Sequence, residues 1–274
     1  MNLDQALHLL AKEPNANLNL ANLCLLLAKD EYPQLDIEAY QNEIEAMGRE
    51  ARDLVRGSLR SKTEGLCRYL FHEQGFTGNC DNYYDHRNSY LNDVLDRHTG
   101  IPITLSALAM IMGEKTGLKI QGIGLPGHFV AQAIDHRGDS ILFDPFHGGN
   151  LLELADCHDL ILKAIGTPVP LTPDLLSPVT LGEMFQRIMT NLKTVYLRKN
   201  DFPRAIRTIH RLRQLNPDNP LEDRDLGTCY MQANQPGRAI APLESFLKRC
   251  PNDASSIHIR KLIQEAKAII SRWN

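Results

Sequence analysis

The sequence has no segment that could hold it in a membrane or direct its secretion. Its longest mostly apolar stretch is the 13 residues from Ile101 to Gly113, whereas a membrane-spanning helix needs about 20. The first residues, Met1 to Gln5, have neither the basic nor the apolar part of a secretory signal. We therefore expect a cytoplasmic protein without a membrane partner.

The usual sequence signatures of metal and cofactor sites are also missing. The six cysteines include no CxxC pair and the ten histidines no HExxH motif, so the spacing predicts reduced thiols and no metal site. Gly122-Ile123-Gly124 lacks the third glycine and the following helix of a dinucleotide-binding loop. The sequence therefore predicts no cofactor and no metal.

Length and composition are those of a globular protein. At about 150 residues per domain, the 274 residues predict about two domains, and 43% apolar against 23% charged residues argue against disorder. The net charge of −3 hides an asymmetry, since residues 1–177 carry 14 Lys and Arg against 24 Asp and Glu, and residues 178–274 carry 16 against 9. The basic part either docks on the acidic part, binds an acidic partner, or is simply solvated.

Helical spacing of apolar residues dominates the first hundred positions, as at Ile37, Tyr40 and Ile44. Ser61-Lys62-Thr63-Glu64 has the form of a capping box, in which the serine oxygen and the glutamate carboxylate accept otherwise unpaired backbone N–H groups. We therefore predict a helix that begins at Ser61 and contains Cys67 as a packing residue.

A core helix and a hairpin are predicted next. Pro102 stands where a first-turn proline belongs, and the apolar run to Met112 favours a helix that is buried nearly all round. Short β-branched or aromatic segments then predict strands over 119–124, 128–134 and 140–143. A three-residue loop at 136–138 would pair residue 130 with Asp144, which places His128 diagonally across from this carboxylate and within reach of a hydrogen bond.

The segment 168–178 contains four prolines, which rule out a continuous helix. We interpret it as a proline-rich linker between a first domain at 1–167 and a second at 179–274.

Beyond this linker the sequence repeats itself at a period of 34 residues. A tetratricopeptide repeat is a helix-turn-helix unit of this length, and the second copy carries its pattern of Leu-Gly, Tyr, Ala and Pro. The second domain therefore resembles two tetratricopeptide repeats, followed by a capping helix at 254–272. The matching pairs are Leu192/Leu226, Tyr196/Tyr230, Asn200/Asn234, Arg204/Arg238, Ala205/Ala239, Ile206/Ile240 and Pro217/Pro251.

The most distinctive motifs lie between residues 82 and 152. They are Asn82-Tyr83-Tyr84-Asp85, Asn88-Ser89-Tyr90-Leu91-Asn92, the run from Arg97 to Ser106, Gly127-His128-Phe129, and Asp144-Pro145-Phe146-His147-Gly148-Gly149. With these motifs the chain resembles the bacterial transglutaminase-like SirB family, in which such a core precedes tetratricopeptide repeats. The resemblance implies an α+β fold related to papain-like and transglutaminase enzymes: a helical N-terminal part, a core helix on an antiparallel sheet, and then an all-α repeat domain.

The resemblance also implies a site. In enzymatic relatives a cysteine at the start of the core helix attacks an amide, a histidine takes its proton, and an aspartate orients the histidine. By motif match, His128 takes the base position and Asp144 the orienting position, but positions 101–104, where the cysteine is expected, are Ile, Pro, Ile and Thr. Thr104 is then the candidate nucleophile, with Ser106 and Cys80 as further alternatives. The alternative role for the Thr104 hydroxyl is that of a helix cap.

Further polar residues are candidates for binding. Four of them, in a region rich in tyrosine, could line a cleft near the start of the core helix: Asn82, Asp85, Asn88 and Arg97. For Asp85 and Asn88 the alternative is a cap of the helix expected at about 90–95. Three arginines on one face of the repeat region, Arg204, Arg207 and Arg211, could hold carboxylates or phosphates. Nucleic acid is not expected, because no aromatic platform accompanies these arginines.

Two functions remain open from the sequence. The first is a cytoplasmic protein-interaction or regulatory factor that acts through its cleft and repeats on an unidentified protein partner, with His128 and Asp144 kept as a structural pair. The alternative is a hydrolase or acyl-transfer enzyme that uses these two residues as a dyad with a Thr, Ser or displaced Cys nucleophile.

Overall fold

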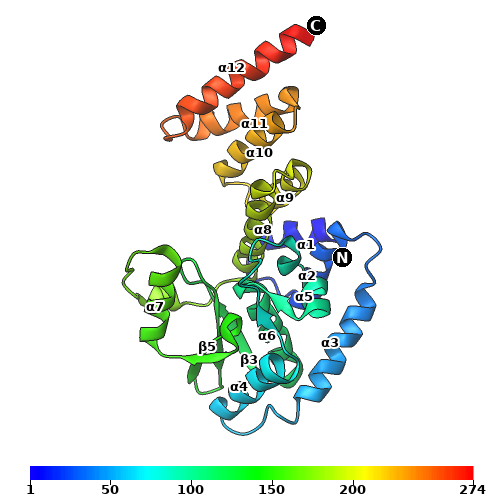
Figure 1. Cartoon of the computed structure of the whole chain (residues 1–274), viewed down its shortest axis with the longest axis vertical. Coiled ribbons are helices and arrows are strands. Elements are labelled where there is room, and N and C mark those ends of the chain that lie inside the picture. The colour runs from blue at the N-terminus through cyan, green and yellow to red at the C-terminus, as the bar shows by residue number, and fades with distance from the viewer. Residues whose placement is uncertain (274) are drawn as a thin grey trace. The chain divides into compact units, whose positions relative to one another are not determined.

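The computed structural model describes residues 1–273, which form two compact units (Figure 1). Of these residues, unit 1 comprises 1–3 and 15–184, and unit 2 comprises 4–14 and 185–273. The proline-rich segment, expected to be a linker, belongs to unit 1, because the Val179 amide donates to the Gly122 carbonyl at 3.0 Å and Pro178 forms a β-bridge with Ile123. The division falls inside a helix, after Met184.

Unit 1 has a helical N-terminal part and a small antiparallel sheet, as the sequence predicts for an α+β core. Its short helical turns are η1 (Arg68–Glu73), η2 (His86–Ser89), η3 (Pro145–His147) and η4 (Pro173–Leu176). Its α-helices are α2 (Leu20–Glu31), α3 (Ile37–Ala51), α4 (Leu59–Cys67), α5 (Leu91–Arg97), α6 (Pro102–Thr116) and α7 (Leu154–Ile165).

The predicted capping box is wrong. Helix α4 begins at Leu59, and its N-cap is Ser58, whose side chain accepts the backbone N–H of Ser61. The Glu64 carboxylate instead accepts from the Arg60 side chain at 2.9 Å, one helical turn earlier. Because Ser58 provides the same chemistry three residues upstream, the helix begins there, and Cys67 is buried in it as predicted.

Helix α6 is the core of unit 1. It begins with Pro102 in its first turn, and its residues from Pro102 to Ala109 are buried on every side, which confirms the prediction. It packs against α3 and against strands β3 (Lys119–Ile123) and β4 (Val130–Ile134).

The four-stranded sheet has the order β3-β4-β5-β6 and is antiparallel throughout, with β5 at Ser140–Asp144 and β6 at Asn150–Leu152. Ala131 pairs with Phe143 and Ile134 with Ser140, the predicted register, and Gly138 occupies the left-handed region at φ +88° in the connecting loop. A separate two-stranded parallel sheet joins β1 (Thr77–Gly78) and β2 (Thr99–Gly100).

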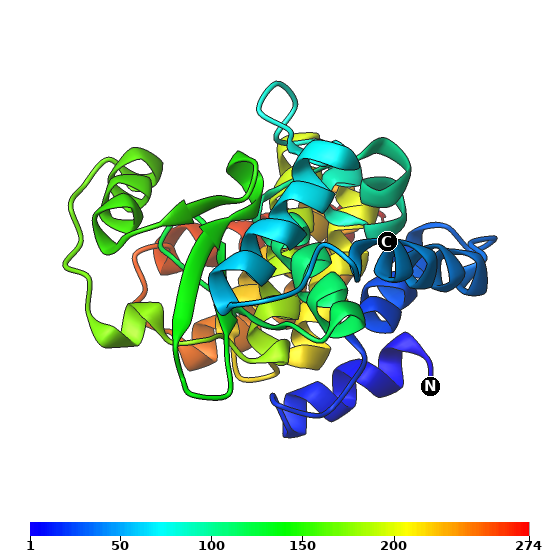
Figure 2. The same cartoon turned by 90° about the horizontal axis from the view of Figure 1, so that it is seen from below.

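Helices cover unit 1 on both sides of the sheet. Figures 1 and 2 both show α3 and α7 on opposite sides of this unit, with α6 and the sheet between them. Helix α7 contributes Cys157 and Ile161 to a buried cluster with Leu125 and Val130. The hairpin ends near residues 128 and 144 are therefore held on a rigid, packed base.

Unit 2 is entirely helical. Asn200 and Asn234, one period apart, share φ 54° before the second helix of each repeat, and these second helices begin and end 34 residues apart, at 202 and 236 and at 215 and 249. Within the described residues no helix is both long and apolar enough to cross a bilayer. The helices are α1 (Leu3–Lys12), α8 (Leu181–Arg198), of which Leu181–Met184 belong to unit 1, α9 (Phe202–Leu215), α10 (Pro220–Gln232), α11 (Pro236–Arg249) and α12 (Ser256–Trp273).

Candidate functional site

His128 and Asp144 meet where β4 begins and β5 ends. The His128 Nε2 atom lies 2.9 Å from the Asp144 Oδ2 atom, the hydrogen bond that the hairpin register predicts. Both residues are buried, with 8% of His128 and 1% of Asp144 exposed. Burial and pairing make this a fixed imidazole–carboxylate unit.

A second imidazole, that of His147, shares this carboxylate. Its Nδ1 atom lies 2.7 Å from the same Asp144 Oδ2 atom, and its side chain is 49% exposed. Sequence reasoning gave His147 no role. The sequence did contain a signal for this contact. Asp144 is the N-cap of the single turn η3, which begins at Pro145, and residue i+3 of such a turn lies next to residue i.

The other oxygen of Asp144 is also occupied. Its Oδ1 atom accepts the backbone N–H groups of Phe146 at 3.0 Å and His147 at 3.4 Å. Burial alone would raise the pKa of Asp144, but the hydrogen bonds and charges of His128 and His147 together lower it below its ordinary value. The carboxylate is therefore held in its charged form, as an orienting group requires.

Aromatic rings connect this site to the tyrosine-rich segment. The Phe146 ring lies edge-on to the His128 ring, with centroids 6.1 Å apart, and edge-on to the Tyr83 ring at 6.2 Å. Phe146 therefore lies between the His128 ring and the Tyr83 ring of the tyrosine-rich segment.

Thr104, the candidate nucleophile, is 4% exposed and stands in the first turn of α6. Its Oγ1 atom lies 2.7 Å from the Asn88 carbonyl and 3.1 Å from the Ile101 carbonyl, and it accepts the Ile101 backbone N–H at 3.1 Å. These contacts make the hydroxyl a cap of α6 and an anchor for Asn88. Ser106 is fully buried, and its hydroxyl has no hydrogen-bond partner in the described part of the chain.

Three of the four predicted binding residues form one network. Asn88 is buried, its Nδ2 atom donates to the Asn82 carbonyl at 2.9 Å, and its Oδ1 atom accepts from Arg97 at 3.3 Å. Asp85 caps η2 and pairs with Arg87 at 2.7 Å and Arg97 at 3.7 Å. The fourth, Asn82, contributes backbone contacts and has an exposed side chain. Asn88 does not cap α5, whose N-cap is Tyr90.

We predict that Asp85→Asn destabilises unit 1 at neutral pH by about 1 kcal/mol, a value that already allows for screening of these charges by solvent. Burial opposes ionisation of Asp85, but the Arg87 hydrogen bonds and the Arg87 and Arg97 charges bring its pKa from 3.8 to about 2. Because the folded pKa lies below the unfolded one, this stabilisation is complete above pH 3.8 and disappears as the pH falls toward about 2. Urea denaturation at several pH values measures the free energy of unfolding of the parent and of Asp85→Asn. The two values should differ at neutral pH and converge in acid, whereas the exposed control Asp81→Asn should match the parent throughout.

The buried thiols of unit 1 are poor nucleophiles. Burial raises the pKa of Cys24 and of Cys67 to about 12, so neither is a thiolate at neutral pH. Cys157 is fully buried, and Cys80 is exposed. The start of α6 offers Ile101, Pro102, Ile103 and Thr104 where the family resemblance expects sulfur.

The three arginines predicted to bind anions, Arg204, Arg207 and Arg211, lie on α9 in unit 2. On α9, Arg204 pairs with Asp201 at 2.7 Å, and Arg211 pairs with Asp4 of α1. Arg207 lies between them on an exposed face. A role for the three in binding remains a prediction.

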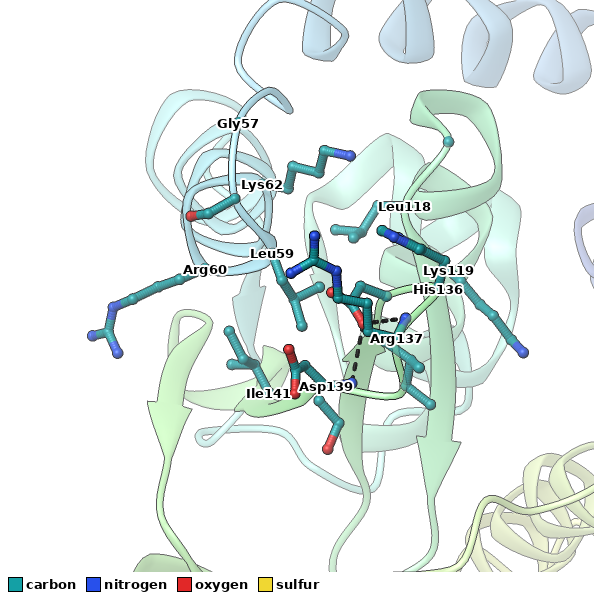
Figure 3. Close-up of a pocket in the computed structure, with 15 residues that line it drawn as sticks. Gly57, Leu59, Arg60, Lys62, Leu118, Lys119, His136, Arg137, Asp139 and Ile141 are labelled. Carbon is teal, nitrogen blue, oxygen red and sulfur yellow. Dashed lines mark hydrogen bonds between the residues drawn. The ribbon is translucent and has the colours of Figure 1, made fainter.

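A cavity of about 1000 Å³ lies at the far end of the β4–β5 hairpin from His128. Figure 3 shows Lys62 from α4 and Arg137 from the hairpin loop reaching into it, while Arg60 points away. The five residues of β4, at roughly 3.3 Å each, separate it from the imidazole. This cavity is therefore not the entrance to the His128 site.

One group in the described residues has the side chains to hold a metal ion. One atom each from His128, Asp144 and His147 lie within 4.8 Å of one another. The spacing of these residues along the chain gave no such indication.

Comparison with protein families separates the two parts of the chain. Residues 38–190 match the transglutaminase-like superfamily, and residues 192–264 match the tetratricopeptide repeat. The first match covers the sheet, α6 and the His128 site, and the second confirms the predicted repeats.

Relatives extend over most of the chain. A UPF0162 protein of Xylella fastidiosa (strain 9a5c) is 33% identical over 89% of this chain and 88% of its own length. A UPF0162 protein of Vibrio cholerae is 29% identical over 87% and 89%, and Protein SirB1 of Salmonella typhimurium is 26% identical over 75% and 76%. No solved structure gives a significant match. The chain thus belongs to the transglutaminase-like superfamily, and within it to the bacterial SirB-like proteins in which this core precedes tetratricopeptide repeats.

Proposed function

We propose that this chain is a cytoplasmic protein-interaction or regulatory factor whose transglutaminase-like unit has kept an imidazole–carboxylate pair without a thiol nucleophile. One observation carries the proposal: at the start of α6 the candidate side chain, Thr104, is buried and hydrogen-bonded to two backbone carbonyls and one backbone N–H. A hydroxyl engaged in this way must lose structural contacts before it can attack a substrate. Six free cysteines are consistent with a reducing compartment.

The repeat unit supplies the partner-binding surface in this proposal. Tetratricopeptide repeats present helix faces to other proteins, and the excess of Lys and Arg in residues 178–274 favours an acidic partner segment. Arg207 is exposed on α9 and carries one of these positive charges.

Activated ester and amide probes test whether the unit is catalytic. The full chain carrying Cys80→Ser, which removes the exposed thiol, is incubated with each probe, and product release and adduct mass are measured. We expect no turnover above buffer, either in this protein or after His128→Gln. Turnover that His128→Gln abolishes and the matched surface variant His158→Gln preserves would contradict the proposal.

Partner binding has its own test. Photo-crosslinking in the native bacterium identifies candidates, and each is then titrated as a purified protein against the full chain. We expect Arg207→Glu to weaken binding about tenfold, within the range for interface charges, and the exposed control Lys248→Glu to leave it unchanged. If every purified candidate binds Arg207→Glu and Lys248→Glu equally tightly, unit 2 is not the proposed surface for an acidic partner.

The alternative is a hydrolase in which an imidazole activates water. It is favoured by His147, whose half-exposed ring is hydrogen-bonded to the buried Asp144 carboxylate. A general base needs this combination of orientation and access to solvent. If the probes are turned over and His147→Gln lowers the rate of turnover, the result favours this alternative.

A further inference from the structure

Two imidazole nitrogens converge on a single oxygen of Asp144. His128 Nε2 and His147 Nδ1 lie 2.9 Å and 2.7 Å from the same Oδ2 atom, and the three atoms are within 4.8 Å of one another. Ligands about 2.0–2.2 Å from an ion lie about 3 Å apart when they meet at right angles and about 3.4 Å apart at tetrahedral angles. The two nitrogen–oxygen separations are those of hydrogen bonds and come close to the right-angle value, so a small outward movement of the rings would let an ion enter.

The ligand types indicate the class of ion. Two imidazoles and one carboxylate suit zinc, iron(II) and related first-row divalent ions, whereas magnesium and calcium take oxygen ligands. Three protein ligands leave coordination positions open for water or substrate.

The surroundings of the carboxylate resemble a supporting shell around a metal ligand. The Asp144 Oδ1 atom is held by the backbone N–H groups of Phe146 and His147, which fixes the carboxylate and leaves Oδ2 facing the two rings. Such support normally orients metal-binding carboxylates. The Phe146 ring packs edge-on against both imidazoles, 6.1 Å from His128 and 5.1 Å from His147 between centroids.

Access comes from one side. Asp144 and His128 are buried, while the His147 side chain is 49% exposed. An ion from solvent would therefore meet His147 before the two buried ligands.

We propose that His128, Asp144 and His147 form a binding site for a divalent transition-metal ion of the zinc or iron(II) class. This inference goes beyond the proposed function and does not depend on it, because a regulatory factor and a hydrolase can both bind such an ion. The three ligands come from the turn before β4, the end of β5 and η3, which is why their spacing in the sequence does not resemble a known metal motif.

The test uses Zn²⁺ and Co²⁺ as probes on the metal-free full chain carrying Cys80→Ser, which removes the exposed thiol as a competing ligand. Titration calorimetry with Zn²⁺ should give one ion per chain, and Co²⁺ should give visible d–d absorption of a nitrogen and oxygen site. We expect His147→Ala to weaken Zn²⁺ binding by more than about 100-fold, beyond the loss for a supporting residue.

His158→Ala is the matched control, because this histidine of the same unit is also partly exposed, with 41% of its side chain accessible. It should leave both readouts unchanged. If His147→Ala lowers helicity, His147→Gln replaces it, since glutamine can still donate a hydrogen bond to Asp144 but is a weak metal ligand. The proposal is overturned if the parent protein binds neither ion, or if the His147 variant binds Zn²⁺ as tightly as the parent.

Discussion

Replacing Lys193 by methionine should lower the free energy of unfolding of unit 2 by about 3–5 kcal/mol. The Lys193 Nζ atom donates to both carboxylate oxygens of Glu222, at 2.8 and 2.9 Å, and to Asp225 at 2.9 Å. Burial would lower the pKa of Lys193, but the two carboxylates raise it overall and keep the ammonium charged. Methionine keeps the length of the side chain and leaves the largely buried Glu222 carboxylate without its cation, next to Asp225, which keeps only its ion pair with Arg224.

Urea denaturation followed by circular dichroism, with hydrogen exchange of the α8 and α10 amides, measures this loss. Lys199→Met is the control in the turn directly after the same helix, since Lys199 is exposed, and should change stability by no more than about 0.5 kcal/mol. Adding Glu222→Gln and Asp225→Asn to Lys193→Met should recover part of the loss, because neutral amides do not repel. Equal effects of Lys193→Met and Lys199→Met would show that the three charges do not stabilise the α8–α10 contact.

Local sequence rules were sufficient for the hairpin and for the repeats. Pro102 starts α6, and Gly138 fixes the loop length that brings His128 opposite Asp144. These features depend on residues close in sequence, where turn chemistry and side-chain period decide the outcome. The 34-residue period is likewise a local feature, because it is the length of one helix-turn-helix unit whose two helices are adjacent in the sequence.

Features that depend on distant residues were not predictable in this way. Helix α1 belongs to unit 2, where Asp4 pairs with Arg211 more than 200 residues away in the chain, and no local pattern encodes that choice. At α4, two serines three residues apart both fit an N-cap, and packing of the segment decides for Ser58.

The candidate site was half predictable. His128 and Asp144 follow from the family motif and the register, whereas His147 enters only because η3 turns its ring back onto Asp144. Thr104 was placed correctly at the start of α6, but its partner, the Asn88 carbonyl, comes from the short turn η2, whose position relative to α6 the sequence does not specify.

Gly149→Ala should destabilise unit 1 by about 2–5 kcal/mol, by adding the strain of a left-handed alanine to overpacking. Gly149 has φ +75°, and an added Cβ would lie 2.5 Å from the Phe71 ring and 2.7 Å from the Cys67 Cβ. Gly148 has the same φ with no atom within 4 Å of its Cβ position. Gly148→Ala therefore measures the backbone strain alone, about 1–2 kcal/mol.

The difference between these two variants, about 1–3 kcal/mol, reports how tightly the end of α4 and η1 press on the turn after Asp144. The Gly149 amide donates to the Asp144 carbonyl at 2.8 Å, so a displaced Gly149 moves the carboxylate as well. Nitrogen chemical shifts of the His128 and His147 rings should then change in Gly149→Ala and stay close to the parent values in Gly148→Ala. Equal destabilisation by both variants would mean that Cys67 and Phe71 yield to the added methyl group. Their packing would then not be what holds Asp144 in place.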